Sequence, residues 1–430
     1  MINKETREQI IRLIHKEVVP AIGCTEPICV ALCVARATER LGCRPEKINV
    51  LLSANILKNA MGVGIPGTGM IGLPIAVALG ALIGKSEYQL EVLKGLTPEA
   101  LEEGKQYISE GRVNIQLKEH ITEKLYVETH VSAGNRHASA VISGGHTNFV
   151  DVPLTATEEE AKSPSVRKDD EDIVLNMRLV YDFATTAPLN EISFIEETRR
   201  YNMGAAREAI KGNYGHNLGK TIDRPLSKGI FGNTIFSHII SRTASACDAR
   251  MGGAMIPVMS NSGSGNQGIC ATNPVCVYAK ENENTEEELL RALVLSHLTA
   301  IYIKQSLGKL SALCGCVVAS IGSSVGITYL MGGDYEHICR SVKNMIANLT
   351  GMICDGAKPS CSLKITSGVS TAILSALLSM EGKCVTSEEG IVDDSVDRSI
   401  HNLTAIGADG MGVTDEMVLR IMTSKKPCTF

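Results

Sequence analysis

The chain has 430 residues, of which 44% are hydrophobic, and a formal net charge of −5. This length exceeds one average domain, so we expect two domains or one large helical domain beside a smaller mixed one. The near-neutral charge argues against nucleic-acid and acidic-membrane binders, which need clustered Lys and Arg. A small molecule is therefore the expected partner.

The cysteine usage and the N-terminal residues indicate a compartment. The 14 cysteines are too thinly spread for a disulfide scaffold, and the segment Met1–Glu5 does not begin a signal-peptide apolar core. We therefore expect a cytoplasmic protein whose thiols are free or metal-bound.

Two uncharged runs raise a membrane alternative. Met61–Gly84 and Ser311–Gly333 contain 24 and 23 residues without a charge, which is long enough to span a bilayer. Both runs are rich in Gly, Ala and Ser, and the chain has no Trp for an interfacial belt. Buried helices and turns are the preferred interpretation, and no membrane contact is expected.

The first candidate catalytic group is Cys24. An amphipathic helix is predicted over Asn3–Val19 and an apolar helix over about Ile28–Leu41, with Pro27 in its first turn. Cys24 thus precedes a helix N-terminus, where partial positive charge lowers the pKa of a thiol. The alternative is that Cys24 is a small buried hydrophobic residue.

A glycine-rich passage follows a predicted strand at Ile48–Ser53. It covers Asn55–Gly69, contains Lys58-Asn59 and Gly67-Thr68, and leads into a predicted helix at Met70–Leu82. Backbone amides in such a turn can face an anion, for which a substrate carboxylate is our choice. A turn that only closes helix packing is the alternative.

The next segment predicts a small, antiparallel sheet. Its strands alternate in hydrophobicity and follow a helix at Pro98–Ser109; they are Val113–Leu117, Leu125–Ser132 and Ser139–Ser143. His146 and Asn148 come directly after the last strand, although a lone His is more often structural than catalytic. The charged segment Thr155–Asp170 is the expected boundary between a mixed region, 1–165, and a helical domain, 166–430.

From Asp172 onward the pattern is almost wholly helical, with predicted helices at Glu286–Ser306, Glu336–Leu349 and Val369–Met380. A run of small and amide residues interrupts it between apolar stretches, so we expect a buried ligand-binding loop rather than a flexible linker. Its candidate binding residues are Ser260, Asn261, Ser262, Asn266 and Gln267.

Three cysteines carry the metal hypothesis. Cys354 and Cys361 flank one turn, and Cys314 lies in an uncharged segment upstream. Structural zinc sites usually show short paired Cys-x2-Cys spacings, which these cysteines lack. Three thiolates suffice for an iron–sulfur cluster whose remaining iron is open to substrate, so we favour a cluster. Cys316 is an alternative to Cys314.

Together these motifs resemble the L-cysteine desulfidase family, which is related to the iron–sulfur L-serine dehydratase alpha chain. The resemblance runs from about Glu17 to Ile421. It is carried by residues 23–27, 66–70, 144–148, 245–253, 259–268, 310–314 and 351–361.

The resemblance implies a PLP-independent elimination that converts L-cysteine to hydrogen sulfide, ammonia and pyruvate. It also implies a [4Fe-4S] cluster on Cys314, Cys354 and Cys361, with Cys24 as the base. In such dehydratases a C-terminal cysteine plugs the open iron, but Cys428 is expected to be a tail residue.

The expected fold is α+β and predominantly α, with a large helical catalytic domain and the small sheet domain, and a homodimer is the expected assembly. L-serine dehydratase, a zinc-stabilised binding protein and a membrane carrier are the alternative functions. The expected substrate-binding residues are Glu26, Lys58, Asn59, Gly67, Thr68, His146, Asn148 and the five residues of the Ser260–Gln267 loop.

Overall fold

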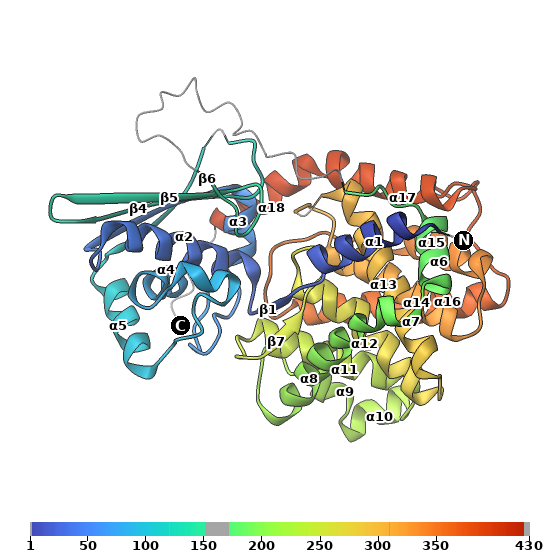
Figure 1. The fold of residues 1–430 in the computed structure, drawn as a ribbon. Helices are drawn as coiled ribbons and strands as arrows, with labels where there is room; N and C mark the ends of the chain where they lie inside the picture. Colours follow the sequence, from blue (N-terminus) through green and yellow to red (C-terminus); the bar gives the residue numbers. More distant parts are fainter. Residues whose placement is uncertain (1, 120, 151–171, 309, 425–430) are drawn as a thin grey trace.

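The computed structural model describes residues 2–119, 121–150, 172–308 and 310–424. Figure 1 shows a smaller sheet-containing part beside a larger helical part. The fold is α+β and predominantly α, as predicted. The predicted boundary at Thr155–Asp170 lies wholly outside the described residues.

The smaller part contains a five-stranded sheet in the order β3-β2-β4-β5-β6. The strands are β2 (Lys47–Leu52), β3 (Val113–Leu117), β4 (Tyr126–Ala133), β5 (Arg136–Ser143) and β6 (Phe149–Val150). Pairing is antiparallel except between β2 and β3, which are parallel. The prediction of a wholly antiparallel sheet was therefore wrong for β3. The helices between β2 and β3 form the long crossover that a parallel pair requires.

Helices cover one face of this sheet (Figure 1). They are α2 (Thr25–Leu41), α4 (Leu73–Leu82) and α5 (Pro98–Ser109), with α3 (Ala54–Ala60) and a 3₁₀ turn at Ser86–Glu91 in the connection. A Cβ at Gly80 would lie 2.6 Å from the Ala31 carbonyl oxygen, so Gly80 allows α4 to pack closely on α2. This contact buries α2 between the sheet and α4.

The larger part is built around α14 (Gly315–Leu330), in which every residue except Gly315 and Tyr329 is buried. Its neighbours are α12 (Gly265–Glu281), α13 (Glu286–Leu307), α15 (Tyr335–Leu349) and α16 (Cys361–Met380). Outside these lie α6 (Met177–Thr186), α7 (Leu189–Ile192), α8 (Glu196–Lys211), α9 (Leu218–Ile222), α10 (Pro225–Phe231), α11 (Ile235–Met251) and α17 (Val396–Ala405). A 3₁₀ turn spans Ser193–Ile195, and a π-helical turn, Ile406–Gly410, leads into α18 (Gly412–Ser424).

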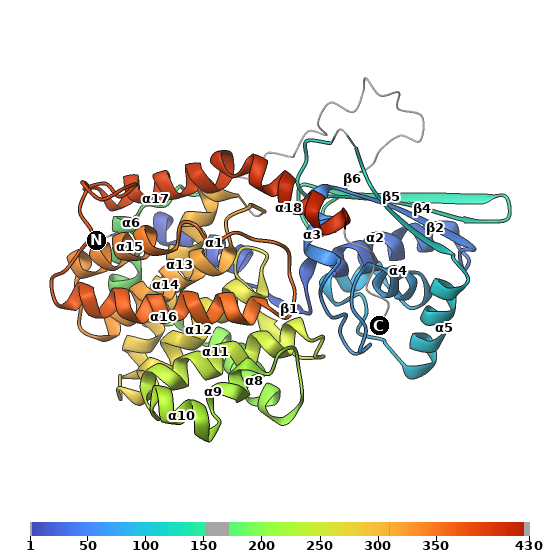
Figure 2. The same ribbon diagram turned by 180° about the vertical axis from the view of Figure 1, so that it is seen from behind.

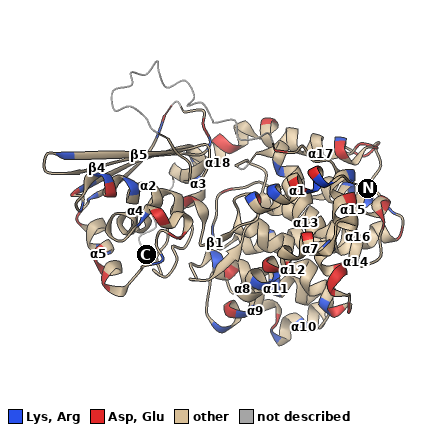
Figure 3. Cartoon of the chain, in the orientation of Figure 1, with Lys and Arg blue, Asp and Glu red and all other residues tan. Residues whose placement is uncertain are grey.

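The uncharged runs that raised the membrane alternative form the shorter apolar helices α4 and α14. Among the described helices, α16 alone has the length and hydropathy of a span, and half of that window is buried within the protein. Core helices share these properties, so α16 is weak evidence for a membrane segment. Figure 3 shows Lys and Arg interspersed with Asp and Glu over both parts.

Both ends of the chain connect the two parts. Helix α1 (Lys4–Glu17) buries Ile10, Leu13 and Ile14 in the core of the helical part. Strand β1 (Pro20–Ile22) then pairs with β7 (Pro257–Met259), which the sequence did not predict. From behind, α18 lies against α3 beside the sheet (Figure 2). The pairing of β1 with β7 brings the start of α2 next to the loop that follows β7.

Candidate active site

The three predicted ligand cysteines come from two chain segments that lie side by side. Leu313 and Ile353 form an isolated antiparallel bridge, which places Cys314 opposite Met352 and Cys354 opposite Ala312. Cys314 is the N-cap of α14, and Cys361 is the first residue of α16. The turn between Cys354 and Cys361 thus returns the third thiol to the same region.

Backbone hydrogen bonds fix this arrangement. The Cys314 N–H donates to Met352 O at 3.0 Å, and the Cys354 N–H donates to Ala312 O at 2.6 Å. Gly356 has φ of +89°, and a Cβ there would lie 2.2 Å from Lys58 O. Only glycine therefore lets the cysteine turn pack directly on the backbone of α3.

The three thiols are close enough for their charges to interact. Burial raises the pKa of Cys361 to about 11, and repulsion from Cys314 and Cys354 adds to this rise. Burial and Cys314 also raise the pKa of Cys354, whereas Lys58 and Lys364 oppose the rise. A hydrogen bond with Cys316 and burial raise the pKa of Cys314. The metal-free thiols are therefore protonated near neutral pH.

This donor set fits a cluster better than a single ion. Within the described ranges, no three His, Cys, Asp or Glu side chains are grouped to share one metal ion. Each thiolate of a cluster binds a different iron, so cluster ligands need not converge as zinc ligands do. Three mutually interacting thiols beside Lys58 and Lys364 suit an anionic thiolate-bound cluster.

Cys316 occupies a different environment from Cys314. It is buried on α14, and its thiol forms hydrogen bonds with Cys270 and Cys314. Cys361 interacts with both Cys314 and Cys316, but the charge interaction found for Cys354 is with Cys314. These contacts favour Cys314 as the ligand. Cys428 lies outside the described residues.

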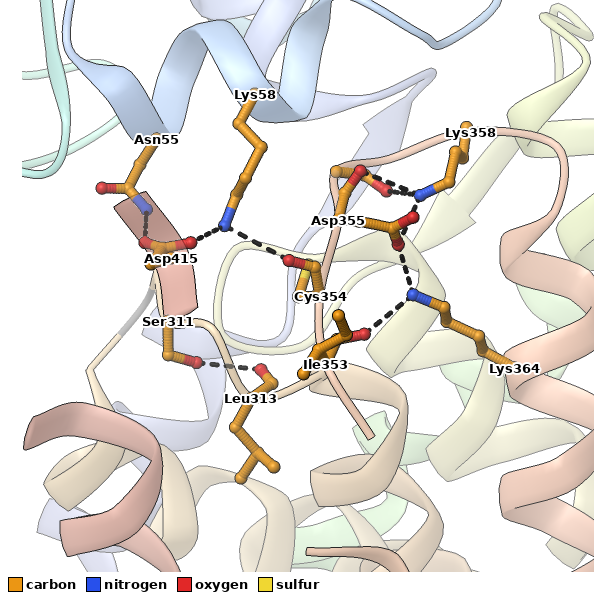
Figure 4. Close-up of polar contacts among 11 residues, drawn as sticks. Asn55, Lys58, Ser311, Leu313, Ile353, Cys354, Asp355, Lys358, Lys364 and Asp415 are labelled. Carbon is orange, nitrogen blue, oxygen red and sulfur yellow. Dashed lines mark hydrogen bonds and ion pairs between the residues drawn. The ribbon is translucent and has the colours of Figure 1, made fainter. Parts of the chain in front are cut away.

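Two lysines flank Cys354 (Figure 4). Lys58 of α3 is 1% exposed; it forms an ion pair with Asp415 of α18, and its Nζ lies 3.5 Å from Cys354 O. Lys364 of α16 donates to Ile353 O at 2.8 Å and pairs with Asp355. The cations on the cysteine side therefore already have carboxylate partners.

Asp355 forms ion pairs with both Lys358 and Lys364. Although burial opposes it, hydrogen bonds from Lys358 and Lys364 lower the pKa of Asp355 to about 2.

A pocket of about 280 Å³ lies between α3 and α18, and its lining includes Asn55, Lys58 and Asp415 but not Cys24. The glycine-rich passage begins with helix α3, so Lys58 and Asn59 lie on a helix that the sequence did not predict.

Cys24 is the N-cap of α2, as expected, but its protonation differs from the prediction. Its Sγ donates to Glu26 Oε2 at 2.8 Å. Burial and the negative charge of Glu26 raise the pKa of Cys24 well above its usual value, whereas Arg250 opposes the rise. The prediction of a lowered pKa was wrong because desolvation and an adjacent carboxylate outweigh the helix N-terminus.

The glycine-rich loop docks onto the end of α11. The Gly67 N–H donates to Gly253 O at 3.0 Å, and the Thr68 N–H donates to Ile65 O at 3.1 Å. The Thr68 hydroxyl also donates to Ile65 O, at 2.8 Å. Both amides are engaged within the protein, so these bonds favour the alternative that the turn closes helix packing.

The Ser260–Gln267 loop is buried, as predicted, and its first residues are held by neighbouring segments. The Ser260 N–H donates to Val19 O at 2.8 Å, and the Ser262 N–H donates to Glu17 O at 2.9 Å. Ser262 adopts φ of +47°, a left-handed conformation. Thr25 donates its hydroxyl to Gly263 O at 2.9 Å, which joins this loop to the Cys24 turn.

His297 of α13 contacts Asn261 of this loop, and the residue pattern had not indicated a role for it. Burial lowers its pKa to about 3, so the ring is neutral. Thr272 donates its hydroxyl to Gly268 O at 2.7 Å, so His297 Nε2 must donate to Thr272, 3.0 Å away. Nδ1 then accepts from Asn261 Nδ2 at 3.1 Å. This chain fixes the orientation of the Asn261 amide.

His146 and Asn148 have different surroundings. A Cβ at Gly263 would lie 3.3 Å from His146 Cε1, so His146 reaches from the sheet to the Ser260–Gln267 loop. Asn148 donates its amide to Ser143 O at 2.8 Å and closes its own turn. The contacts therefore place His146 at the site and give Asn148 a local structural role.

Asn266 and Gln267 open helix α12 and face two other site elements. Asn266 Oδ1 accepts from Arg250 Nη1 at 3.0 Å. The Gln267 side chain packs so closely on Gly315 that a Cβ there would lie 3.1 Å from its Cδ, and its buried Oε1 has no hydrogen-bond partner in the described structure. Arg250 is a site residue that the sequence analysis missed, although a charge within a small-residue helix was a signal.

Comparison with known proteins gives a consistent family match. The family model described as the serine dehydratase alpha chain matches residues 87–420. A protein of Bacteroides thetaiotaomicron is 66% identical over the full length of both chains. One of Porphyromonas gingivalis is 54% identical over 98% of this chain and 99% of its own. One of Oleidesulfovibrio alaskensis is 46% identical over 97% and 98%. All three are named UPF0597 protein.

Proposed function

Because the chain belongs to the serine dehydratase alpha-chain family, we propose that it is a lyase that removes the β-substituent of a small amino acid, with L-cysteine as substrate. The observation that supports this proposal is the pairing of segments 312–314 and 352–354, together with the charge interactions of Cys361 with Cys314 and Cys354. The choice of cysteine depends on the motif resemblance. L-serine is the second candidate, because the matching family is that of the serine dehydratase alpha chain.

The cofactor assignment follows from the same thiols. Cys314, Cys354 and Cys361 would hold a [4Fe-4S] cluster, and no PLP is required. When bound, the cluster supplies a Lewis-acidic iron that withdraws electrons from the leaving sulfur or oxygen. Lys58 and Lys364 favour the thiolate form of Cys354 that cluster binding requires.

The proton chemistry belongs to Cys24 and Glu26. Because Cys24 is protonated in the free protein, it must first pass its proton to Glu26, whose Oε2 lies 2.8 Å away. The Cys24 thiolate then removes the Cα proton of the substrate as the bond from Cβ to sulfur breaks. Sulfide leaves with its electron pair, and the aminoacrylate product hydrolyses in water to pyruvate and ammonia.

Parallel assays under anaerobic conditions test the proposal. Protein purified without oxygen should be brown and should form equal amounts of sulfide and pyruvate from L-cysteine. Pyruvate from L-serine at a higher kcat/KM would make serine the substrate. Protein loaded with iron and sulfide that forms pyruvate from neither amino acid would contradict the lyase assignment.

A further inference from the structure

Arg250 is a buried cation without an anionic partner among the described residues. It is the penultimate residue of α11 and is 3% exposed. Within the described ranges no Asp or Glu oxygen lies within 4.0 Å of its guanidinium, and its buried Nε has no hydrogen-bond partner. A charge removed from water in this way is normally paired. By contrast, Lys58 is buried against Asp415, and Lys364 pairs with Asp355.

The protein fixes the guanidinium of Arg250 in place. A Cβ at Gly265 would lie 2.3 Å from Arg250 Nε and 2.8 Å from Cζ, so only glycine at the start of α12 admits the group. Nη1 donates to Asn266 Oδ1 at 3.0 Å, which sets the rotation of the plane. The N-terminus of this 17-residue helix adds positive potential beside Arg250.

Arg250 and Cys247 share a partner in the candidate site, because the Cys247 Sγ also donates to Asn266 Oδ1, at 3.6 Å. The charge of Arg250 acts on Cys24, which places it near the proposed base. Its charge also acts on Cys247, whose thiol interacts with Cys361 and Cys314 as well. An anion on Arg250 would therefore lie near Cys24 and near Cys247, which itself interacts with two of the ligand cysteines.

We propose that Arg250 binds the α-carboxylate of the amino-acid substrate. A guanidinium presents parallel N–H donors that match a carboxylate, and the bound anion would supply the charge that Arg250 lacks in the described structure. The inference depends on the proposed function, because only an amino-acid substrate brings a carboxylate next to the carbon that Cys24 deprotonates. It assigns the anion to Arg250 rather than to the amides of Gly67 and Thr68.

The test compares ligands with and without the carboxylate. Binding of L-alanine and of L-alaninamide to the anaerobic, cluster-loaded full chain is measured by isothermal titration calorimetry; neither ligand has a leaving group. Arg250→Gln should weaken L-alanine binding about 10- to 100-fold, the loss expected for a charged hydrogen-bonded pair. L-alaninamide binding should change less than twofold, and Arg250→Lys should give intermediate L-alanine affinity.

Arg242→Gln is the matched control. Arg242 lies on the same helix but already faces Asp223 at 3.5 Å. This variant should bind both ligands as the wild type does. If Arg250→Gln weakens both ligands equally, or leaves L-alanine binding unchanged, Arg250 does not bind the carboxylate. If Arg250→Gln does not fold, the same comparison in Arg250→Lys decides.

The two proposals can fail separately. Wild-type protein that binds L-alanine but forms no pyruvate would contradict the lyase function, and the ligand comparison would still support Arg250 as the carboxylate site. Normal turnover by Arg250→Gln with an unchanged KM would contradict the role of Arg250 and leave the lyase function intact.

Discussion

The two sides of the candidate site differ in how completely their polar groups are paired. On the ligand-cysteine side, Lys58 pairs with Asp415 and Lys364 pairs with Asp355. On the Cys24 side, Arg250 has no carboxylate partner in the described structure, and the buried Gln267 Oε1 has no hydrogen-bond partner there. Paired groups hold a turn in place, whereas a buried group without a partner beside a candidate site has hydrogen bonds left for a ligand. The comparison separates two regions. The cofactor platform consists of the three ligand cysteines with Lys58 and Lys364, and the substrate-facing wall consists of Cys24, Glu26, Arg250 and Gln267.

The strongest way to break the cofactor platform is to remove one ligand. Cys354→Ala should abolish both the visible absorption of the cluster and all turnover, because the remaining two thiols cannot retain it. Absorption spectra and iron content after anaerobic reconstitution check this result. Cys384→Ala, a half-buried thiol that borders Arg340 and Val385, is the control and should keep both. A Cys354→Ala protein with a normal spectrum would exclude Cys354 as a ligand.

Removal of the proposed base from the substrate-facing wall should affect turnover but not the cluster. Cys24→Ala should lower kcat about 100- to 10,000-fold, the range for loss of a general base, while leaving the cluster spectrum intact. Spectra and steady-state rates on the same preparation give both readouts. Retained activity would refute Cys24 as the base.

Glu26→Gln sharpens the assignment through pH. The charge of Glu26 raises the pKa of Cys24, so removing that charge lowers it. Activity that requires the Cys24 thiolate rises with pH, and in Glu26→Gln this rise should move to lower pH. The maximal rate should also fall, because the proton acceptor for Cys24 is lost. A pH–rate profile of kcat/KM checks the shift, and an unchanged profile would contradict the coupling.

The buried pair between Lys58 and Asp415 tests whether the platform is built for stability. Asp415→Asn leaves Lys58 buried without its counter-ion and should lower the free energy of unfolding by about 2–4 kcal/mol. The double variant Lys58→Met with Asp415→Leu removes both charges and should recover most of that loss. Urea denaturation measures the difference. Equal stability of Asp415→Asn and wild type would show that α18 does not depend on this contact.

A smaller effect is expected at the turn between Cys354 and Cys361. Gly356→Ala forces an L side chain into φ of +89° and toward Lys58 O. It should cost about 1–3 kcal/mol of stability and reduce cluster occupancy without altering the Cys24 wall. Gly382→Ala, also at positive φ but with no atom within 4 Å of the added Cβ, separates backbone strain from the clash. Equal losses in both variants would remove the role of the contact with α3.

Local patterns of the sequence predicted much of the fold. The helix Pro98–Ser109 and the strand Val113–Leu117 have the predicted bounds, and Cys24 caps a helix as expected. Residue periodicity and capping residues act over one or two turns, so they can be read without the tertiary structure. The choice of Cys314, Cys354 and Cys361 as candidate ligands likewise needed only the residue types and the resemblance to a family.

Tertiary contacts decided the rest, because burial and charge depend on residues distant in the chain. The pKa of Cys24 rises since folding buries it beside Glu26, which the helix terminus alone did not reveal. Strand β3 joins β2 in parallel because the helices between them form a crossover. That Arg250 has no carboxylate partner in the described structure could be known only from the tertiary structure. The residues that surround its guanidinium come from distant parts of the chain, and no local pattern predicts them.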